Sequence, residues 1–167
     1  MNDSVTAGFV RVGGRLVIDL LNTVGARDGV PVDLLDNPED LPIWADVVGL
    51  PYGGDLGIRS DAELTELREL REVLREGLRR WREGDPVSPG LIARLNRELA
   101  RDPRHVRLRM QDGALVTEMV STGDPLERLY ADVAASLAMM LGRDDRSRYR
   151  SCANETCPFT FYDDSKP

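Results

Sequence analysis

The sequence predicts an α+β fold, in which a mostly helical domain with one β-hairpin precedes a small irregular C-terminal fragment. Three patterns support this prediction. Residues 60–83 repeat leucine at three- and four-residue steps, which is typical of an amphipathic helix. Residues 104–120 alternate around Asp112-Gly113, which is typical of a hairpin. Residues 148–165 contain both cysteines, among arginines and aromatic side chains.

The length of 167 residues suits one domain with an appendage. We place the globular domain at residues 1–142, and a basic linker with the cysteine segment at residues 143–167, because Gly142 ends the last predicted helix. The chain has no run of 18 apolar residues and no signal-peptide pattern. We therefore expect a cytoplasmic protein that does not enter a membrane.

The negative charge is concentrated in the front of the chain. Residues 1–142 contain 17 basic and 24 acidic side chains, a net charge of −7. Residues 143–150 contain four arginines against Asp144 and Asp145. Because an acidic surface repels phosphate, any binding to nucleic acid is expected to come from the tail.

The first elements are the least clear. Phe9 to Val12 is compatible with a short strand, and Leu16 to Val24 with either a strand or a helix. In a helix, Asp19, Asn22 and Thr23 would share one face, because residues three and four apart are neighbours. These groups would then either line a pocket for a small polar ligand or pin neighbouring loops, since buried polar groups find partners.

Residues 25–60 are rich in glycine and proline and are expected to be mostly loop. A short helix is predicted from Pro42 to Val48, with Gly49 after it. Ile43, Trp44, Val47 and Val48 are expected to face inward from this helix. Trp44 suits the core better than a ligand platform, because aromatic side chains dominate core packing.

The helix at residues 60–83 has the clearest pattern. Ser60 and Glu63 form a capping box at its start. Its charged residues are expected to form a solvated face with weak pairs along the helix. The apolar stripe is expected to pack into the core, and it consists of Leu64, Leu67, Leu70, Leu74, Leu78 and Trp81.

Two further helices flank the predicted hairpin. Ser88 and Pro89 begin one, and Asp124-Pro125 begins the other, which runs to about Leu141. Small side chains allow the last helix to pack closely against another, and they are Ala131, Ala134, Ala135 and Ala138. On the hairpin, three arginines either clamp an anion or form a solvated face, namely Arg104, Arg107 and Arg109.

The tail resembles half of a zinc site. Cys152 and Cys157 lie close together among turn-forming residues, and structural zinc sites use four ligands, usually as two such pairs. A site of both cysteines and His105 with Asp163 as the fourth ligand is conceivable but disfavoured, because closed structural sites favour cysteine and histidine. The neighbouring Arg148 and Arg150 are expected to lower the thiol pKa and to allow redox sensitivity.

The order of these tail residues resembles the opening of the bacterial CGNR zinc-finger family. It comprises Arg148, Arg150, Cys152, Cys157, Phe161, Asp163 and Ser165. Members of that family continue with a second cysteine pair, so the resemblance implies that the finger is truncated in this chain. Their front domain, called ABATE, begins with a Leu-Asp-x-x-Asn-Thr motif, which Asp19, Asn22 and Thr23 match. Arg27 and Trp44 also fit.

The resemblance implies a stress-induced transcription regulator. Its front domain would sense a ligand or partner, and a zinc finger would contact DNA through Arg146, Arg148 and Arg150. With the finger incomplete, DNA binding by this chain is expected to be weak or absent.

Two alternatives stay open. The front domain would act alone as a small-molecule binder or enzyme through the ligand residues Asp19, Asn22, Thr23, Arg27 and Trp44. Otherwise the chain would be an interaction module that forms a homodimer through its alanine-rich last helix. No catalytic motif such as G-x-S-x-G or a Walker sequence occurs, which favours a protein that is not an enzyme.

Overall fold

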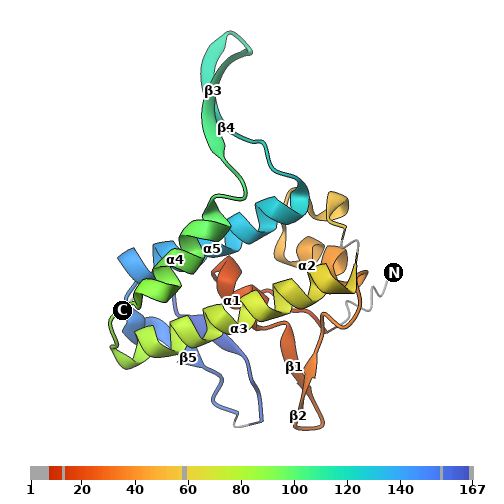
Figure 1. Ribbon diagram of the computed structural model, residues 1–167, viewed down its shortest axis with the longest axis vertical. Coiled ribbons are helices and arrows are strands. Elements are labelled where there is room, and N and C mark those ends of the chain that lie inside the picture. The colour runs from red at the N-terminus through yellow and green to blue at the C-terminus, as the bar shows by residue number, and fades with distance from the viewer. Residues whose placement is uncertain (1–7, 13, 58–59, 155, 166–167) are drawn as a thin grey trace.

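The computed structural model describes residues 8–12, 14–57, 60–154 and 156–165. These residues form an α+β fold of helices and three separate antiparallel hairpins (Figure 1). In order, the elements are α1 (Leu16–Leu21), β1 (Val24–Arg27), β2 (Val30–Asp33), α2 (Asp40–Val48), η1 (Gly53–Asp55), α3 (Asp61–Glu83), α4 (Pro89–Leu99), β3 (Arg104–Gln111), β4 (Ala114–Ser121), α5 (Pro125–Arg143), η2 (Arg146–Arg148), β5 (Tyr149–Ser151) and β6 (Thr160–Tyr162).

The core lies between the short helix α1 and the long helices α3 and α5. Helix α3 begins where the Ser60 hydroxyl accepts a hydrogen bond from the Glu63 N–H, at 3.3 Å, and ends at Gly84 in the left-handed conformation. Asp124 caps α5 through the N–H groups of Leu126 and Glu127. The predicted apolar stripe of α3 is confirmed, since all six of its side chains are buried.

The hairpin formed by β3 and β4 is confirmed, and it projects away from the helical body (Figure 1). Asp112 and Gly113 form its turn with φ angles of 51° and 79°, the pair of positive values that a two-residue hairpin turn needs. At its base, the buried Asp102 accepts hydrogen bonds from the Ser121 hydroxyl, at 2.7 Å, and the Gly123 N–H, at 3.0 Å. This network fixes where the hairpin leaves the body.

The region expected to be loop contains a second hairpin. Strands β1 and β2 pair from Val24 with Asp33 to Arg27 with Val30. Asp28 and Gly29 turn between them with φ angles of 52° and 79°. The prediction of loop is therefore wrong for residues 25–33, and the ambiguous segment from Leu16 to Val24 divides into helix α1 and the start of strand β1.

Two smaller expectations are also wrong. Phe9 to Val12 is not a strand, although Phe9 is buried. Ile43 on helix α2 is 41% exposed instead of facing inward. The expectation that the alanines of α5 pack closely against another helix is confirmed for Ala131 and Ala134, which are buried where α5 packs on α1 and α4.

The tail packs onto the front domain. Strands β5 and β6 pair from Tyr149 with Tyr162 to Ser151 with Thr160, and β6 lies against α1. Tyr149 and Tyr162 are buried with the core. No described helix has the length and apolar character needed to span a membrane.

Candidate functional site

The end of helix α1 is joined to the tail by one side chain. The Asn22 amide donates to the Thr160 carbonyl at 2.8 Å, and its oxygen accepts from the Thr160 N–H at 2.9 Å. Asn22 is 3% exposed. The Asn22 side chain therefore satisfies both backbone groups of Thr160, as the backbone of a neighbouring strand would. This confirms for Asn22 the interpretation that the motif residues pin neighbouring segments.

A second clamp lies at the other end of α1. Arg15 donates to Asp144 at 2.8 Å and to Asp164 at 3.0 Å, and its guanidinium stacks 4.4 Å from the centre of the Tyr162 ring. Asp144 and Asp164 flank the cysteine segment in the sequence. The tail is thus bound at both ends of α1.

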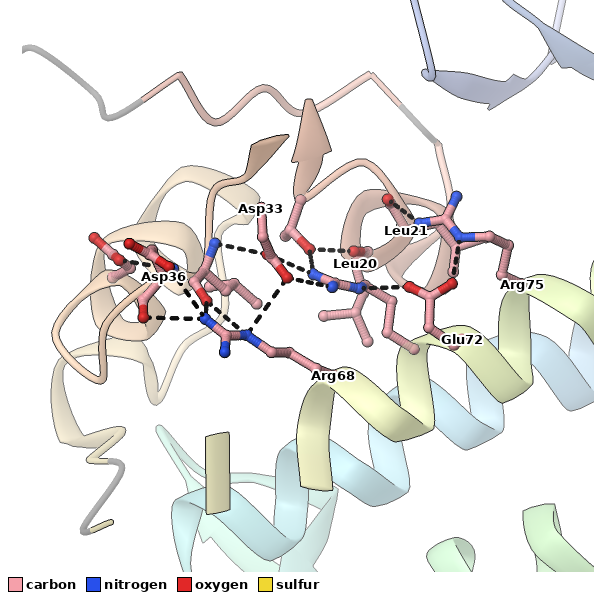
Figure 2. A network of polar contacts seen from close by, with 11 residues as sticks. Leu20, Leu21, Asp33, Asp36, Arg68, Glu72 and Arg75 are labelled. Carbon is pink, nitrogen blue, oxygen red and sulfur yellow. Dashed lines mark hydrogen bonds and ion pairs between the residues drawn. The ribbon is translucent and has the colours of Figure 1, made fainter. Parts of the chain in front are cut away.

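Thr23 belongs to a buried network with Arg71 of α3 (Figure 2). The Thr23 hydroxyl donates to the Leu20 carbonyl at 2.7 Å and accepts from Arg71 at 2.8 Å. The Arg71 guanidinium also binds both carboxylate oxygens of Asp33, at 2.8 and 2.5 Å. Although burial opposes ionisation of Asp33, the two-point contact with Arg71 lowers the pKa of this carboxyl. The network ties α1, β2 and α3 together.

Two more arginines of α3 extend this network (Figure 2). Arg68 donates to the Leu35 carbonyl at 2.9 Å, and Arg75 donates to the Leu21 carbonyl at 2.9 Å. The predicted solvated face of α3 is correct for Arg79, which pairs with glutamates on the surface, but wrong for these arginines. They satisfy carbonyl groups where α1 and β2 end.

The remaining motif residues do not gather around one opening. Asp19 is 5% exposed, and its carbonyl accepts a hydrogen bond from the Trp44 indole at 3.4 Å. Trp44 is 1% exposed, as expected of a core side chain. Arg27 is exposed and lines a hollow of about 390 Å³ between the first hairpin and Phe159 of the tail. Asp19, Asn22, Thr23 and Trp44 do not line this hollow.

The two cysteines are free thiols that face each other. Both are half-buried, and the Cys157 thiol hydrogen-bonds to that of Cys152. The Cys152 N–H donates to the Phe159 carbonyl at 2.8 Å, and the Cys157 N–H donates to the Asn154 carbonyl at 2.9 Å. These backbone hydrogen bonds close the cysteine loop.

The pKa of Cys152 is lowered, as expected, but the cause differs from the prediction. The Asn154 backbone contributes most, the Cys157 thiol next, and the Ala153 backbone adds to them. Arg148 and Arg150 are not the cause. Backbone groups directed at a sulfur atom favour thiolate, which is the form that binds metal.

The described residues contain no group of three or more histidine, cysteine or acidic side chains able to hold a metal ion. His105 lies on β3 of the projecting hairpin, and it forms no metal-binding group with the cysteines among the described residues. The two thiols fit two positions of a tetrahedral zinc site. The other two ligands would have to come from outside the described residues.

The three predicted DNA-contacting arginines differ in their surroundings. Arg148 donates to the Ser165 carbonyl and lies 5.8 Å from the centre of the Tyr162 ring. Arg146 lies beside Gly84 at the end of α3. Arg150 is exposed on β5, opposite Phe161. Arg146 and Arg150 are thus exposed, whereas Arg148 is half-buried and supports the tail.

A mostly apolar groove of about 430 Å³ runs along α3 on the side of α4. Val73, Trp81 and Leu91 contribute its apolar walls, and Glu76 and Asp85 contribute acidic groups. Gly77 forms the floor, where a Cβ atom would lie 2.7 Å from a methyl group of Leu91. No residue of the Asp-x-x-Asn-Thr motif reaches this groove.

Two comparisons with known proteins bear on this chain. The ABATE family model, described as "Putative stress-induced transcription regulator", matches residues 14–144. No curated protein matches the sequence. The match spans α1 to α5 and ends before the cysteines.

Proposed function

Because the chain belongs to the ABATE family, we propose that it is a transcription regulator whose front domain carries a zinc-binding, DNA-contacting tail. The observation that carries the proposal is the pair of hydrogen bonds between Asn22 and Thr160. It joins the family motif on α1 to the strand that follows the cysteines. A change in the front domain would therefore alter the position of the tail.

Zinc is the metal that the thiol pair fits best. Cys152 and Cys157 would provide two thiolate ligands, and two ligands from outside the described residues would complete a closed structural site. Bound zinc would supply no chemistry beyond fixing the fold of the tail. The backbone groups of Asn154 and Ala153 prepare the Cys152 sulfur for this role by favouring its ionised form.

The distribution of charge supports DNA contact through the tail alone. The acidic front domain repels phosphate, whereas Arg146 and Arg150 are free of the contacts that hold Arg148. Two such cations bind DNA weakly, so a completed finger would have to add the rest. DNA binding by residues 1–167 is expected only at low ionic strength.

We assign ligand sensing to the groove along α3 rather than to the motif face. Asn22 and Thr23 already hold protein partners, so a ligand there would have to break those bonds. The groove along α3 offers apolar walls and a few polar groups, as small-molecule sites do. This argument also weakens the alternative of a stand-alone enzyme at Asp19, Asn22 and Thr23.

The zinc proposal is tested with cobalt, which reports thiolate ligands through its visible absorption. The chain should bind Co²⁺ with a thiolate charge-transfer band that zinc abolishes. Cys152→Ser and Cys157→Ser should each remove this band, whereas Ser151→Ala, at the end of strand β5, should retain it. A band that survives either cysteine substitution would exclude the pair as ligands.

The DNA proposal is tested with a fluorescent duplex of random sequence. The chain should bind at low salt, with an affinity that falls as salt increases. The double variant Arg146→Gln, Arg150→Gln should bind the duplex more weakly than the wild-type chain does at the same salt concentration. Arg107→Gln with Arg109→Gln removes the same charge from the distant hairpin and serves as the control. Equal binding by both double variants would contradict DNA contact through the tail.

A further inference from the structure

The hairpin of β3 and β4 has an apolar face that the described residues leave exposed. Its register places Val106 opposite Met119, Leu108 opposite Thr117, and Met110 opposite Leu115. The five apolar members are each 61–65% exposed. Exposed apolar side chains that are contiguous mark interaction sites, whereas scattered ones do not.

The hairpin is held firmly at its base. Arg104 donates to Asp102 at 2.7 Å and to Asp132 of α5 at 2.5 Å. The Tyr52 hydroxyl donates to the same Asp132 carboxylate at 2.5 Å. The base of the hairpin is thus fixed to the body, and the hairpin projects away from the helices (Figure 1). Its apolar side chains are exposed.

The charged side chains on the opposite face of the hairpin already have ion-pair partners. Arg107 pairs with Glu118 at 2.6 Å, and Arg109 pairs with the same carboxylate at 3.1 Å. An isolated two-stranded hairpin is marginally stable in water unless one of its faces is covered. Each strand has only its hairpin partner among the described residues, so both outer edges are also open.

We propose that the apolar face of the β3–β4 hairpin is covered by the same face of a second copy of this chain. None of the six residues on this face is charged, so two copies can meet without opposing like charges. Leu108 and Thr117 lie midway along it, where a two-fold axis would pass, as isologous dimers require. This inference goes beyond the proposed regulatory function and does not depend on zinc or DNA.

The exposure and the charges favour a second copy over other partners. The five apolar side chains are each more than 60% exposed, and homodimer interfaces are the ones whose buried core is most apolar. DNA would need cations on the contacting face, yet Arg107 and Arg109 lie on the other side. A membrane would also favour cations around the apolar residues, and the domain beneath is acidic.

The test is the mass of the intact chain in solution, measured by sedimentation equilibrium. The wild-type chain should approach twice its monomer mass of 18.6 kDa at micromolar concentrations. The double variant Leu108→Thr, Met119→Thr should stay monomeric at these concentrations, because the two substitutions should weaken association at least tenfold. Val116→Thr with Val120→Thr places the same change on the opposite face and should dimerise as the wild type does. Threonine retains strand propensity, and circular dichroism confirms that each variant is folded.

Either of two results would overturn the proposal. One is a wild-type chain that stays monomeric at about 100 μM, and the other is a dimer that the Leu108 and Met119 substitutions leave intact. Flotation with vesicles of anionic phospholipid by a monomeric wild-type chain would assign the face to a membrane instead. Retention of a random DNA duplex that the Leu108 and Met119 substitutions abolish would assign it to nucleic acid.

Discussion

Asn22 at the end of helix α1 and Thr160 on strand β6 exchange two hydrogen bonds, although 138 positions separate them in the sequence. Thr160 follows the cysteine loop, and Asn22 belongs to the motif of the front domain. The contact is part-buried, so water cannot easily replace it. It gives this motif a structural role that short-range patterns do not reveal.

We predict that Asn22→Ala loosens the tail while leaving the helices folded. The substitution leaves the Thr160 N–H and carbonyl unpaired, which costs about 1–3 kcal/mol for a buried group. Hydrogen exchange should accelerate for residues 149–162, and the free energy of unfolding should fall by an amount in this range. Asn22→Asp keeps the acceptor but loses the donor, so its effect should be intermediate.

Asn96 provides the control for this prediction, because it lies exposed on α4. Asn96→Ala should leave exchange in the tail unchanged. Equal protection of residues 149–162 in wild type and Asn22→Ala would show that the tail is held by other contacts, such as those of Arg15.

Arg71→Met should destabilise the domain strongly. Arg71 is 3% exposed and holds Asp33 and Thr23, so its removal leaves buried partners unsatisfied. Loss of one member of a buried pair costs about 3–5 kcal/mol, and we expect the lower end because Asp33 is partly exposed. Urea unfolding measures the difference. Arg79→Met on the same helix removes an exposed pair and should change the free energy of unfolding far less than Arg71→Met does.

The long helices and the projecting hairpin could be predicted because their signals are local. The capping box at Ser60, the Ser88-Pro89 start and the Asp112-Gly113 turn each lie beside the element that they define. The first hairpin was missed although Asp28-Gly29 gives the same turn signal. Its strands of four residues are short, and the surrounding glycines and prolines suggested loop.

The polar contacts of the site depend on residues far apart in sequence, which explains why they were missed. Arg71 had a usable signal, since it lies between Leu67 and Leu74 on the buried stripe of α3. A charged residue in such a position needs a buried partner. Its partner Asp33 lies on another element, and no periodicity could identify it.

Acid should weaken the base of the β3–β4 hairpin. Burial alone would raise the pKa of Asp102, but hydrogen bonds from Ser121, Arg104 and Gly123 lower it to about 2. An unfolded aspartate has a pKa of about 3.9. As pH falls from about 4 to about 2, the unfolded chain takes up the proton first, so a stabilising contribution of about 2 kcal/mol is lost.

The difference in unfolding free energy between wild type and Asp102→Asn isolates this contribution. It should be constant above about pH 5 and should shrink as pH approaches 2. A difference that stays constant down to pH 2 would mean that Asp102 titrates normally. Because Asp102 joins both ends of the hairpin, exchange of the strands should report the same change.

Alkylation should distinguish the two explanations for the lowered pKa of Cys152. With a chelator present, the rate of iodoacetamide modification should follow a titration below the ordinary thiol value of about 8.5. Mass spectrometry of the digested chain assigns each rate to its cysteine. Cys157→Ala removes one of the groups that favour the Cys152 thiolate, so the midpoint for Cys152 should move upward.

The arginines provide the contrasting variant. Arg148→Gln with Arg150→Gln removes two positive charges from the flanking strand but leaves the Asn154, Ala153 and Cys157 contacts in place. The Cys152 midpoint should therefore change little. A large upward shift in this variant, with none in Cys157→Ala, would assign the activation to long-range charge. The cysteine loop would then lack the backbone preparation that a metal-binding pair needs.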